Sequence, residues 1–313
     1  MGKILLNGVG GQLGQYAAKF LLNLEDKSNL IFCSSNESTL KEYADMGIET
    51  HVVDFRTYND KLEEAFKNAD VVGIISMPFV GKKRQQAHKN AIDAAKKVGV
   101  KKIVYTSLAN ASDETNPSYE KIDHAFTEDY TKSVGMDYIF LRNSQFADPM
   151  ISAYFFFGNI NQTFTNNSGD GHMAFISRKD CAKALAYALH RANEYDHATL
   201  NINGKELITM RDLVNIGNQV TGNNYVYKVL TDEESYKEFE AQGIPRTTDD
   251  DDFFEKSPSP YCAEGAVTFG KAIRLEKFAI FTDDFKKLTG DDPVSISYMY
   301  SHPDEYPVGL FYK

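Results

Sequence analysis

Short apolar runs alternate with longer amphipathic stretches through the first half of this 313-residue chain. The runs have the length and the composition of buried strands, and the stretches between them carry apolar residues at helical spacing. Such alternation predicts a parallel sheet built from strand–helix–strand units. The expected strands are residues 3–7, 29–35, 49–55, 70–76, 101–107 and 137–143.

A glycine-rich segment, NGVGGQLG at residues 7–14, follows the first expected strand directly. Gly8, Gly11 and Gly14 are three residues apart. The dinucleotide fingerprint G-x-G-x-x-G would instead need a glycine at position 13, where Leu13 stands. In either spacing the glycines let a strand turn sharply into a helix whose free N–H groups face a pyrophosphate. An ordinary strand-to-helix turn is the alternative that this segment alone leaves open.

Together these features predict an α/β fold, a Rossmann-type doubly wound parallel sheet with a smaller C-terminal α/β substrate lobe. The ligand of such a sheet lies at the carboxyl ends of its strands. From about residue 143 the alternation becomes irregular and rich in aromatic residues. We therefore expect a dinucleotide-binding domain at residues 1–150 and a substrate-binding lobe in most of 151–313, with some segments returning to the first domain.

The composition excludes several classes of partner. Lys and Arg total 34 against 44 Asp and Glu, a formal charge of −10, so we expect neither nucleic acid nor an anionic membrane to bind. The longest apolar run, residues 71–80, is too short to cross a bilayer. Three widely spaced cysteines suit reduced thiols and suggest no zinc site. A cytoplasmic protein is expected, with a homo-oligomer possible.

The end of the second expected strand bears on the choice of dinucleotide. An NAD site usually has Asp or Glu there, but this chain has Cys33 followed by Ser34, Ser35 and Asn36. We expect NADP as the cofactor, with NAD still possible, because these three side chains can donate hydrogen bonds to a 2′-phosphate and Lys41 follows on the next helix. A serine-rich turn with a helix cap is an equal alternative.

Further cofactor contacts are expected after the third, fourth and fifth strands. A carboxylate at Asp54 can accept a hydrogen bond from the adenine amino group, and Phe55 can border the base. The backbone after the fourth strand should pass near the ribose and pyrophosphate. The residues at these later strand ends are Ser76, Met77, Pro78 and Thr106.

The absence of one motif restricts the reactions that we expect this protein to catalyse. Short-chain dehydrogenases place a catalytic serine where Ser107 stands and complete the site with Tyr-x-x-x-Lys, which transfers a proton. None of the 18 tyrosines has a lysine four residues on. The chain therefore lacks the acid and the base that alcohol oxidation and sugar epimerisation ordinarily use. Hydride transfer to a conjugated acceptor such as a quinone remains, because solvent can protonate the delocalised anion that results.

An aromatic stretch after the sixth strand offers a wall for such a flat acceptor. Phe146, Met150, Tyr154 and residues 155–157 make up this stretch, although consecutive aromatic residues are more often core. The four successive aspartates at 249–252 are read as a solvated acidic loop, and no metal site is expected.

Several motifs in register resemble the NmrA-like atypical short-chain dehydrogenase family, and within it the bacterial NADPH:quinone oxidoreductase and triphenylmethane reductase type. The glycine loop GVGGQLG resembles the family's G-A-T-G-Q-L-G. Three longer segments also resemble the family, AHKNAIDAAKKVGVKKIVYTSL, LRNSQFADP and GDGHMAFISRKDCAKAL. The resemblance extends over nearly the whole chain.

The resemblance implies an NAD(P)H-dependent reductase of quinones or similar conjugated acceptors. It implies that NADPH binds through Gly8, Gly11, Gly14 and the neighbouring Gln12 and Leu13. It also implies that Asn143 lies near the nicotinamide and the substrate. Because some NmrA-like proteins are sensors, a non-catalytic dinucleotide-sensing regulator is the alternative.

Two positions depart from the family pattern. Relatives usually have an arginine after the second strand, where this chain has Cys33 or Ser34. The family's H-x-x-T-E-K begins here with His124 but ends in Asp129, so a lysine is missing. We expect His124 to be a polar residue of the substrate pocket, with a hydrogen-bonded helix histidine as the plainer alternative.

Overall fold

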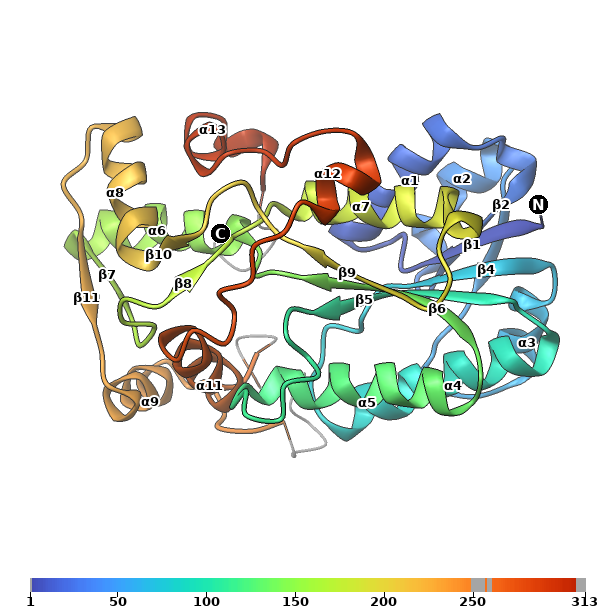
Figure 1. Ribbon diagram of the computed structural model, residues 1–313, viewed down its shortest axis with the longest axis horizontal. Coiled ribbons are helices and arrows are strands. Elements are labelled where there is room, and N and C mark those ends of the chain that lie inside the picture. Colours follow the sequence, from blue (N-terminus) through green and yellow to red (C-terminus); the bar gives the residue numbers. More distant parts are fainter. Residues whose placement is uncertain (1, 249–256, 258–260, 308–313) are drawn as a thin grey trace.

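A seven-stranded parallel sheet forms the centre of the computed structural model, which describes residues 2–248, 257 and 261–307 (Figure 1). The strand order is β3-β2-β1-β4-β5-β6-β9, so the winding reverses between β1 and β4. The strands are β1 (Lys3–Asn7), β2 (Leu30–Ser34), β3 (Glu49–Val52), β4 (Ala69–Ile74), β5 (Lys102–Leu108), β6 (Asp137–Asn143) and β9 (Ala198–Ile202). The first six fall closely on the six expected runs, and the Rossmann-like α/β fold is confirmed.

Helices cover both faces of the sheet (Figure 1). On one face lie α1 (Gln12–Leu24), α7 (Arg178–His190) and α12 (Asp284–Thr289), and a short α2 (Lys41–Asp45) packs at the β3 edge. On the other face lie α3 (Asp60–Phe66), α4 (Lys82–Val98) and α5 (Tyr119–Ser133).

Each sheet face has its own apolar core because side chains alternate along a strand. Leu6 and Val104 belong to the cluster that includes α1 and α7, whereas their chain neighbours Leu5 and Ile103 belong to the cluster with α3 and α4. All four side chains are buried. Burial on both faces explains why the strands read as continuous apolar runs rather than as an alternating pattern.

A second lobe lies at the carboxyl ends of the strands (Figure 1). It has its own apolar core and two small sheets, which pair β8 with β10 and β7 with β11. Its strands are β7 (Thr163–Asn166), β8 (His172–Met173), β10 (Ile208–Thr209) and β11 (Val226–Val229). Its helices are α6 (Ala147–Asn161), α8 (Met210–Thr221), α9 (Asp232–Ala241), α11 (Ala263–Arg274) and α13 (Ile296–Ser301).

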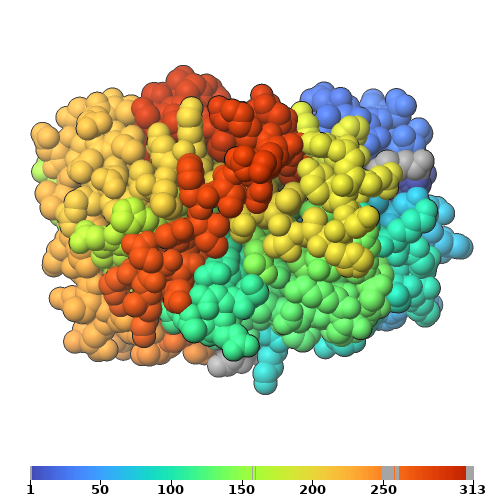
Figure 2. Space-filling model, viewed as in Figure 1, coloured from blue at the N-terminus to red at the C-terminus, as the bar shows by residue number. Residues whose placement is uncertain are grey.

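The chain passes between the two parts several times. After leaving the sheet for α6, it returns to form α7 and β9, goes back to the second lobe, and returns again for α12. Figure 2 shows the chain after α11 running across one face of the molecule from the second lobe to the sheet layer. The division at residue 150 stays a prediction, and the sheet layer includes elements from beyond it.

The sequence also predicts a solvated acidic loop and no membrane-spanning segment. The acidic run at 249–252 lies outside the described residues. In the described part of the chain, no helix is long and apolar enough to cross a membrane.

Candidate functional site

The glycine loop joins β1 to α1 at the point where the strand order reverses. Gly8 has a φ of +75°, a left-handed conformation that glycine adopts readily, and its carbonyl oxygen accepts a hydrogen bond from the Gly11 N–H at 3.0 Å. A Cβ atom on Gly14 would lie 2.0 Å from that same oxygen. The backbone therefore requires glycine at both Gly8 and Gly14.

Gly11 differs from the other glycines of the loop. A Cβ atom on Gly10 would lie 2.8 Å from the Ser34 hydroxyl oxygen, so the end of β2 restricts that position. On Gly11, the nearest described atom to such a Cβ would be the Gly8 carbonyl oxygen, 3.6 Å away, which is an ordinary contact. No packing within the described chain requires glycine at Gly11. A missing side chain there is what close approach of a ligand would demand.

The amino end of α1 is suited to an anion. Its N-cap is Gly11, which provides no side-chain acceptor, and the first turn holds no acidic residue. By contrast, the N-caps of α7 and α8 are Ser177 and Thr209, whose side chains accept hydrogen bonds from the first turn. The first N–H groups of a helix lack intrahelical partners and carry partial positive charge. A pyrophosphate bound here would accept hydrogen bonds from them.

Arg178 adds a positive charge beside the same loop, which the sequence reading did not identify. Its Nη1 donates to the Gln12 Oε1 atom at 2.7 Å, and its guanidinium lies 5.1 Å from the centre of the Phe146 ring. Gln12 also donates from Nε2 to the Pro307 carbonyl oxygen at 3.1 Å. Leu13 is buried, so only its backbone is available to a ligand. The glycine loop is thus tied to α6, α7 and the last described residue.

The residues after β2 form a capped turn, as one of the two alternatives expected. The Asn36 Oδ1 atom accepts from the Ser38 N–H at 3.0 Å, and the buried Ser34 hydroxyl oxygen accepts from the Asn36 N–H at 3.1 Å. The Ser35 side chain is exposed and makes no hydrogen bond within the described chain. Lys41 pairs with Asp45 at 2.7 Å. Ser35 therefore has an exposed hydroxyl with no partner in the described chain, and its role in binding a 2′-phosphate stays a prediction.

Asp54 and Phe55, which follow β3, both contact other side chains of the protein. Two nitrogens of Arg56 donate to the Asp54 Oδ2 atom, at 2.9 and 2.6 Å, and this pairing lowers the pKa of Asp54. The Phe55 ring is buried edge-on against Phe66 in the core, an arrangement that argues against contact with adenine. The adenine roles of Asp54 and Phe55 stay predictions.

The chain after β4 is held through three consecutive backbone N–H groups. The Ile75 N–H donates to the Asn7 Oδ1 atom at 2.8 Å, and the Ser76 N–H donates to the Thr106 hydroxyl oxygen at 2.9 Å. The Met77 N–H donates to the His88 Nε2 atom at 3.1 Å. Pro78 follows as an exposed residue. These three backbone hydrogen bonds fix the position of the loop.

His88 fixes this loop from a fully buried position on α4. Because its Nε2 accepts from Met77, the proton of the neutral ring is on Nδ1, which donates to the Thr127 hydroxyl oxygen at 2.9 Å. Thr127 in turn donates to the Asp123 carbonyl oxygen at 2.8 Å. Burial, with a smaller contribution from Arg84, lowers the His88 pKa from 6.5 to about 3. His88 is therefore neutral at physiological pH.

The buried neutral state of His88 predicts a pH-dependent stability. Below pH 6.5 the unfolded chain takes up a proton at His88 that the folded chain does not. The contribution of His88 to the free energy of unfolding is therefore complete above that pH and is lost as the pH falls. The expected slope is about 1.4 kcal/mol per pH unit. Between about pH 6 and pH 4, His88→Gln should reduce the slope of the free energy of unfolding against pH, measured by urea unfolding, by about that amount. The exposed-site variant His302→Gln is the control, and an unchanged slope in His88→Gln would contradict the assignment.

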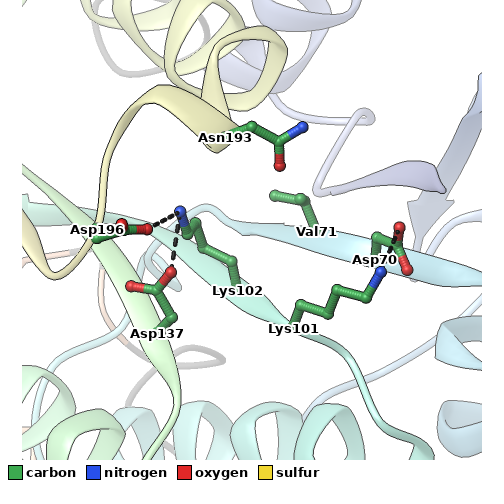
Figure 3. Close-up of a pocket in the computed structure, with 7 residues that line it drawn as sticks. All are labelled: Asp70, Val71, Lys101, Lys102, Asp137, Asn193 and Asp196. Carbon is green, nitrogen blue, oxygen red and sulfur yellow. Dashed lines mark hydrogen bonds and ion pairs between the residues drawn. The ribbon is translucent and has the colours of Figure 1, made fainter. Parts of the chain in front are cut away.

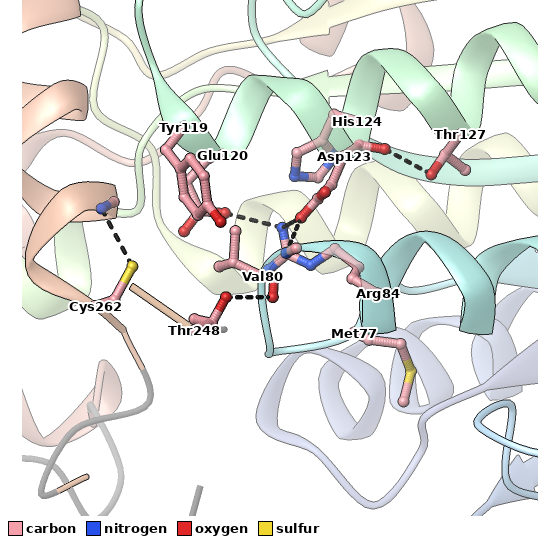
Figure 4. Close-up of polar contacts among 12 residues, drawn as sticks. Met77, Val80, Arg84, Tyr119, Glu120, Asp123, His124, Thr127, Thr248 and Cys262 are labelled. Atoms are coloured by element: carbon pink, nitrogen blue, oxygen red, sulfur yellow. Dashed lines mark hydrogen bonds and ion pairs between the residues drawn. The ribbon is translucent and has the colours of Figure 1, made fainter. Parts of the chain in front are cut away.

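A buried polar cluster lies between α4, α5 and the chain at residue 248 (Figure 4). Arg84 Nη1 donates to the Glu120 Oε2 atom at 2.9 Å, and the Gly81 N–H donates to the Asp123 Oδ2 atom at 2.7 Å. The Thr248 hydroxyl donates to the Val80 carbonyl oxygen at 2.9 Å. These contacts fix the start of α4, and with it the far end of the loop after β4.

Ser107 lies at the end of β5 but its hydroxyl has a partner within the chain. It donates to the Glu128 Oε1 atom at 2.6 Å. Arg142 binds both oxygens of the same buried carboxylate, at 3.0 and 2.6 Å. His124, one turn before Glu128, lies with its Nδ1 atom 2.8 Å from the Tyr105 hydroxyl, and burial lowers the His124 pKa well below 6.5. The catalytic role of Ser107 and the pocket role of His124 stay predictions.

Asn143 ends β6 in a different environment. Its side chain is buried, and its Oδ1 atom has no hydrogen-bond partner in the described chain. The next two residues share this property, because the Ser144 hydroxyl and the Gln145 Oε1 atom are also buried without a partner among the described residues. Each unsatisfied buried polar atom costs about 1–3 kcal/mol. Three in succession can be satisfied only by water or by a polar ligand from outside the described chain.

The aromatic stretch after β6 is partly exposed and partly buried in the core of the second lobe. Phe146 is partly exposed beneath Arg178, and the Met150 sulfur accepts from the Gln145 Nε2 atom at 3.5 Å. Tyr154 is fully buried in the core of the second lobe and donates to the Asn218 Oδ1 atom at 2.9 Å, which argues against a role as an acceptor contact. The side chain of Phe157 is outside the described set.

A cavity of about 300 Å³ lies at the opposite end of the sheet (Figure 3). It is lined by residues at the amino ends of the strands, including Val71 of β4, Lys102 of β5 and Asp137 of β6. The Lys102 ammonium donates to the Ala192 carbonyl oxygen at 2.6 Å and pairs with Asp137 at 2.9 Å. Its charge is thus already satisfied. The candidate site is the glycine loop and the strand ends, not this cavity.

The fold and this site define a dinucleotide-binding protein. Residues 8–192 match the family described as NAD(P)H-binding, and the chain belongs to that family. Quinone oxidoreductase 2 of Escherichia coli strain K12 is 28% identical over 247 residues, which are 77% of this chain and 82% of that protein. An NmrA-like family domain-containing oxidoreductase of Aspergillus flavus is 22% identical over 245 residues, 74% of this chain and 76% of that protein. The expected resemblance to these families is confirmed.

Solved structures share the whole fold. The Escherichia coli NADPH-dependent quinone oxidoreductase complexed with NADPH superposes with a TM-score of 0.85 at 24% identity, covering 96% of this chain and 99% of that one. The Citrobacter sp. triphenylmethane reductase complexed with NADP(H) superposes with a TM-score of 0.81 at 24% identity, with the same coverage. These likenesses confirm the expected fold over both lobes.

Proposed function

We propose that this protein is an NAD(P)H-dependent reductase that transfers hydride to a quinone or a similar conjugated acceptor. The observation that carries the proposal is the run of buried, unpartnered polar atoms on Asn143, Ser144 and Gln145, among the described residues, at the carboxyl end of β6. In the strand order, β6 lies two strands from β4 and three from β1, where the glycine loop begins. A dinucleotide extended along these strand ends would span the distance between the two sites.

The pyrophosphate would bind at the free N–H groups that begin α1, next to the Arg178 guanidinium. NADP is favoured over NAD because no carboxylate ends β2 to repel a 2′-phosphate, and the exposed Ser35 hydroxyl is free to donate to it. The NADPH named for the solved Escherichia coli relative also supports this choice.

Bound NAD(P)H would supply the hydride. Asn143 would hold the nicotinamide carboxamide through its buried amide, and Phe146 and Met150 would lie beside the path by which a flat acceptor approaches the nicotinamide. A quinone that receives hydride becomes a hydroquinone monoanion, which takes one proton from solvent. No Tyr-x-x-x-Lys pair occurs in the chain, so catalysis would depend on alignment of two flat rings.

Fluorescence titration with NADPH and NADH, followed by turnover against quinones, triarylmethane dyes and enones, tests the proposal. We expect tighter binding of NADPH and oxidation of the cofactor by quinones. Binding without turnover for every acceptor would contradict a reductase and would favour the dinucleotide-sensing regulator. A failure to bind either dinucleotide would contradict both functions.

Ser107→Ala is expected to lower quinone reduction by about tenfold or less, since no proton passes through this hydroxyl. The variant should also lose about 1–2 kcal/mol of stability, because buried Glu128 loses a hydrogen-bond donor. Steady-state kinetics and urea unfolding measure the two effects. Ser133→Ala, at an exposed position on α5, is the control. A thousandfold loss of turnover would show that Ser107 takes part in the chemistry.

A further inference from the structure

A second cavity, of about 140 Å³, lies beside the proposed site between α6 and the segment after α13. Apart from one serine, its lining is aliphatic, aromatic or proline. Three lining residues come from α6 and three from the segment at the end of the described chain. They are Ile151, Ser152, Phe155, Pro303, Tyr306 and Pro307.

Two contacts place this cavity next to the parts of the candidate site. Pro307, which lines it, accepts a hydrogen bond from the Gln12 side chain at the start of α1. Ile151 follows Met150, whose sulfur is bound by the Gln145 side chain. The cavity therefore lies next to the Gln12 side chain of the glycine loop, and its wall on α6 begins one residue after the methionine that Gln145 contacts.

Two of the residues that line this cavity, Ser152 and Tyr306, carry hydroxyl groups. Neither the Ser152 hydroxyl nor the Tyr306 hydroxyl makes a hydrogen bond within the described part of the chain. Burial raises the pKa of Tyr306, so its phenol is protonated and able to donate at neutral pH. The Lys179 ammonium lies 5.6 Å from the centre of the same ring. A few placed donors in an apolar cavity are typical of a small-molecule site.

We propose that this cavity binds the acceptor and restricts it to a single-ring quinone, with Ser152 and Tyr306 donating to the carbonyl oxygens. The proposal rests on the proposed function. An apolar cavity of about 150 Å³ holds one benzene molecule, so a volume of about 140 Å³ matches one ring rather than three. This chain should therefore differ from its structural neighbour that is named for triphenylmethane dyes.

The first test measures binding without turnover. Calorimetry would follow 1,4-dihydroxybenzene binding to the protein saturated with NADP⁺. Ser152→Phe, which fills the cavity, should weaken binding at least tenfold while the affinity for NADPH stays within twofold of wild type. Ser133→Phe, on an exposed part of α5, is the matched control and should bind normally. Equal binding by Ser152→Phe and wild type, or no binding to wild type, would overturn the proposal.

The second test measures specificity. Tyr306→Leu should raise the KM for 1,4-benzoquinone about tenfold and leave the KM for NADPH unchanged. Tyr187→Leu is the matched control, because that ring also carries a lysine ammonium, at 5.7 Å, but lies on α7 outside the cavity. Faster reduction of malachite green than of benzoquinone by wild type would overturn the size limit.

The two proposals fail separately in these experiments. Quinone turnover that Ser152→Phe leaves unchanged would refute the cavity as the acceptor site and leave the reductase intact. Binding of 1,4-dihydroxybenzene that Ser152→Phe abolishes, in a protein that reduces no quinone, would support the cavity and refute the reductase.

Discussion

Gly11→Asp is expected to abolish dinucleotide binding while the protein stays folded. The new Cβ atom would meet only the Gly8 carbonyl oxygen, at an ordinary contact distance of 3.6 Å within the described chain. The carboxylate, however, would occupy the amino end of α1 and repel the pyrophosphate. Like charges in contact cost several kcal/mol, which corresponds to at least about a hundredfold in Kd. Fluorescence titration with NADPH and thermal unfolding measure the two properties.

Two further glycine variants distinguish an effect of the negative charge on binding from an effect of the added Cβ atom on folding. Gly11→Ala adds the same Cβ atom without a charge and should therefore weaken NADPH binding much less than Gly11→Asp does. Gly14→Ala should instead destabilise the protein, because its Cβ atom would lie 2.0 Å from the Gly8 carbonyl oxygen. Micromolar NADPH binding by Gly11→Asp would refute the glycine loop as the pyrophosphate site.

Glu128→Leu is expected to cost about 3–5 kcal/mol of folding free energy. Glu128 is 1% exposed and holds both the Arg142 guanidinium and the Ser107 hydroxyl. Removal of the carboxylate leaves a largely buried positive charge and a donor without an acceptor. Urea unfolding monitored by circular dichroism measures the change.

The control for this variant is an ion pair on the same helix. Asp129 pairs with Lys132 at 3.4 Å on the exposed side of α5. Asp129→Asn should change stability by less than about 1 kcal/mol, since exposed pairs contribute little. Equal losses in the two variants would show that burial of the Glu128 pair has no energetic consequence.

The fold was accessible from the sequence because its determinants are local. Each parallel strand is buried on both faces and therefore appears as an apolar run, and helical spacing separates the runs. The glycines were recognisable for the same reason. Gly8 supplies a left-handed turn and Gly14 a close approach between a strand and the helix that follows it. Neither requirement depends on residues distant in the chain.

The polar partners of the site were not accessible, because they join distant positions. Gln12 and Arg178 are 166 positions apart, and Gln12 and Pro307 are 295 apart. His88 carried a weak signal, as a histidine among the alanines of an amphipathic helix. Nothing in its neighbourhood indicated the Met77 N–H that it binds.

The aromatic stretch after β6 shows another limit of prediction from the sequence. An apolar or aromatic residue on a helix has the same sequence signature whether it lines a cavity or lies in the core. Phe155 lines the smaller cavity, whereas its neighbour Tyr154 is buried against Tyr300. Only the packing of α6 on α8 and α13 distinguishes the two positions.

The position of β9 has a practical consequence. This strand follows α6 and α7 in the chain but pairs with β6, and α7 packs on α1. A fragment cut at residue 150 would leave β6 with an open row of N–H and C=O groups and would strip the apolar cover from α1. Open strand edges recruit other chains and aggregate. The first 150 residues therefore do not form a unit that can be moved into another protein. Chimeras with relatives should exchange single strands rather than whole halves of the chain.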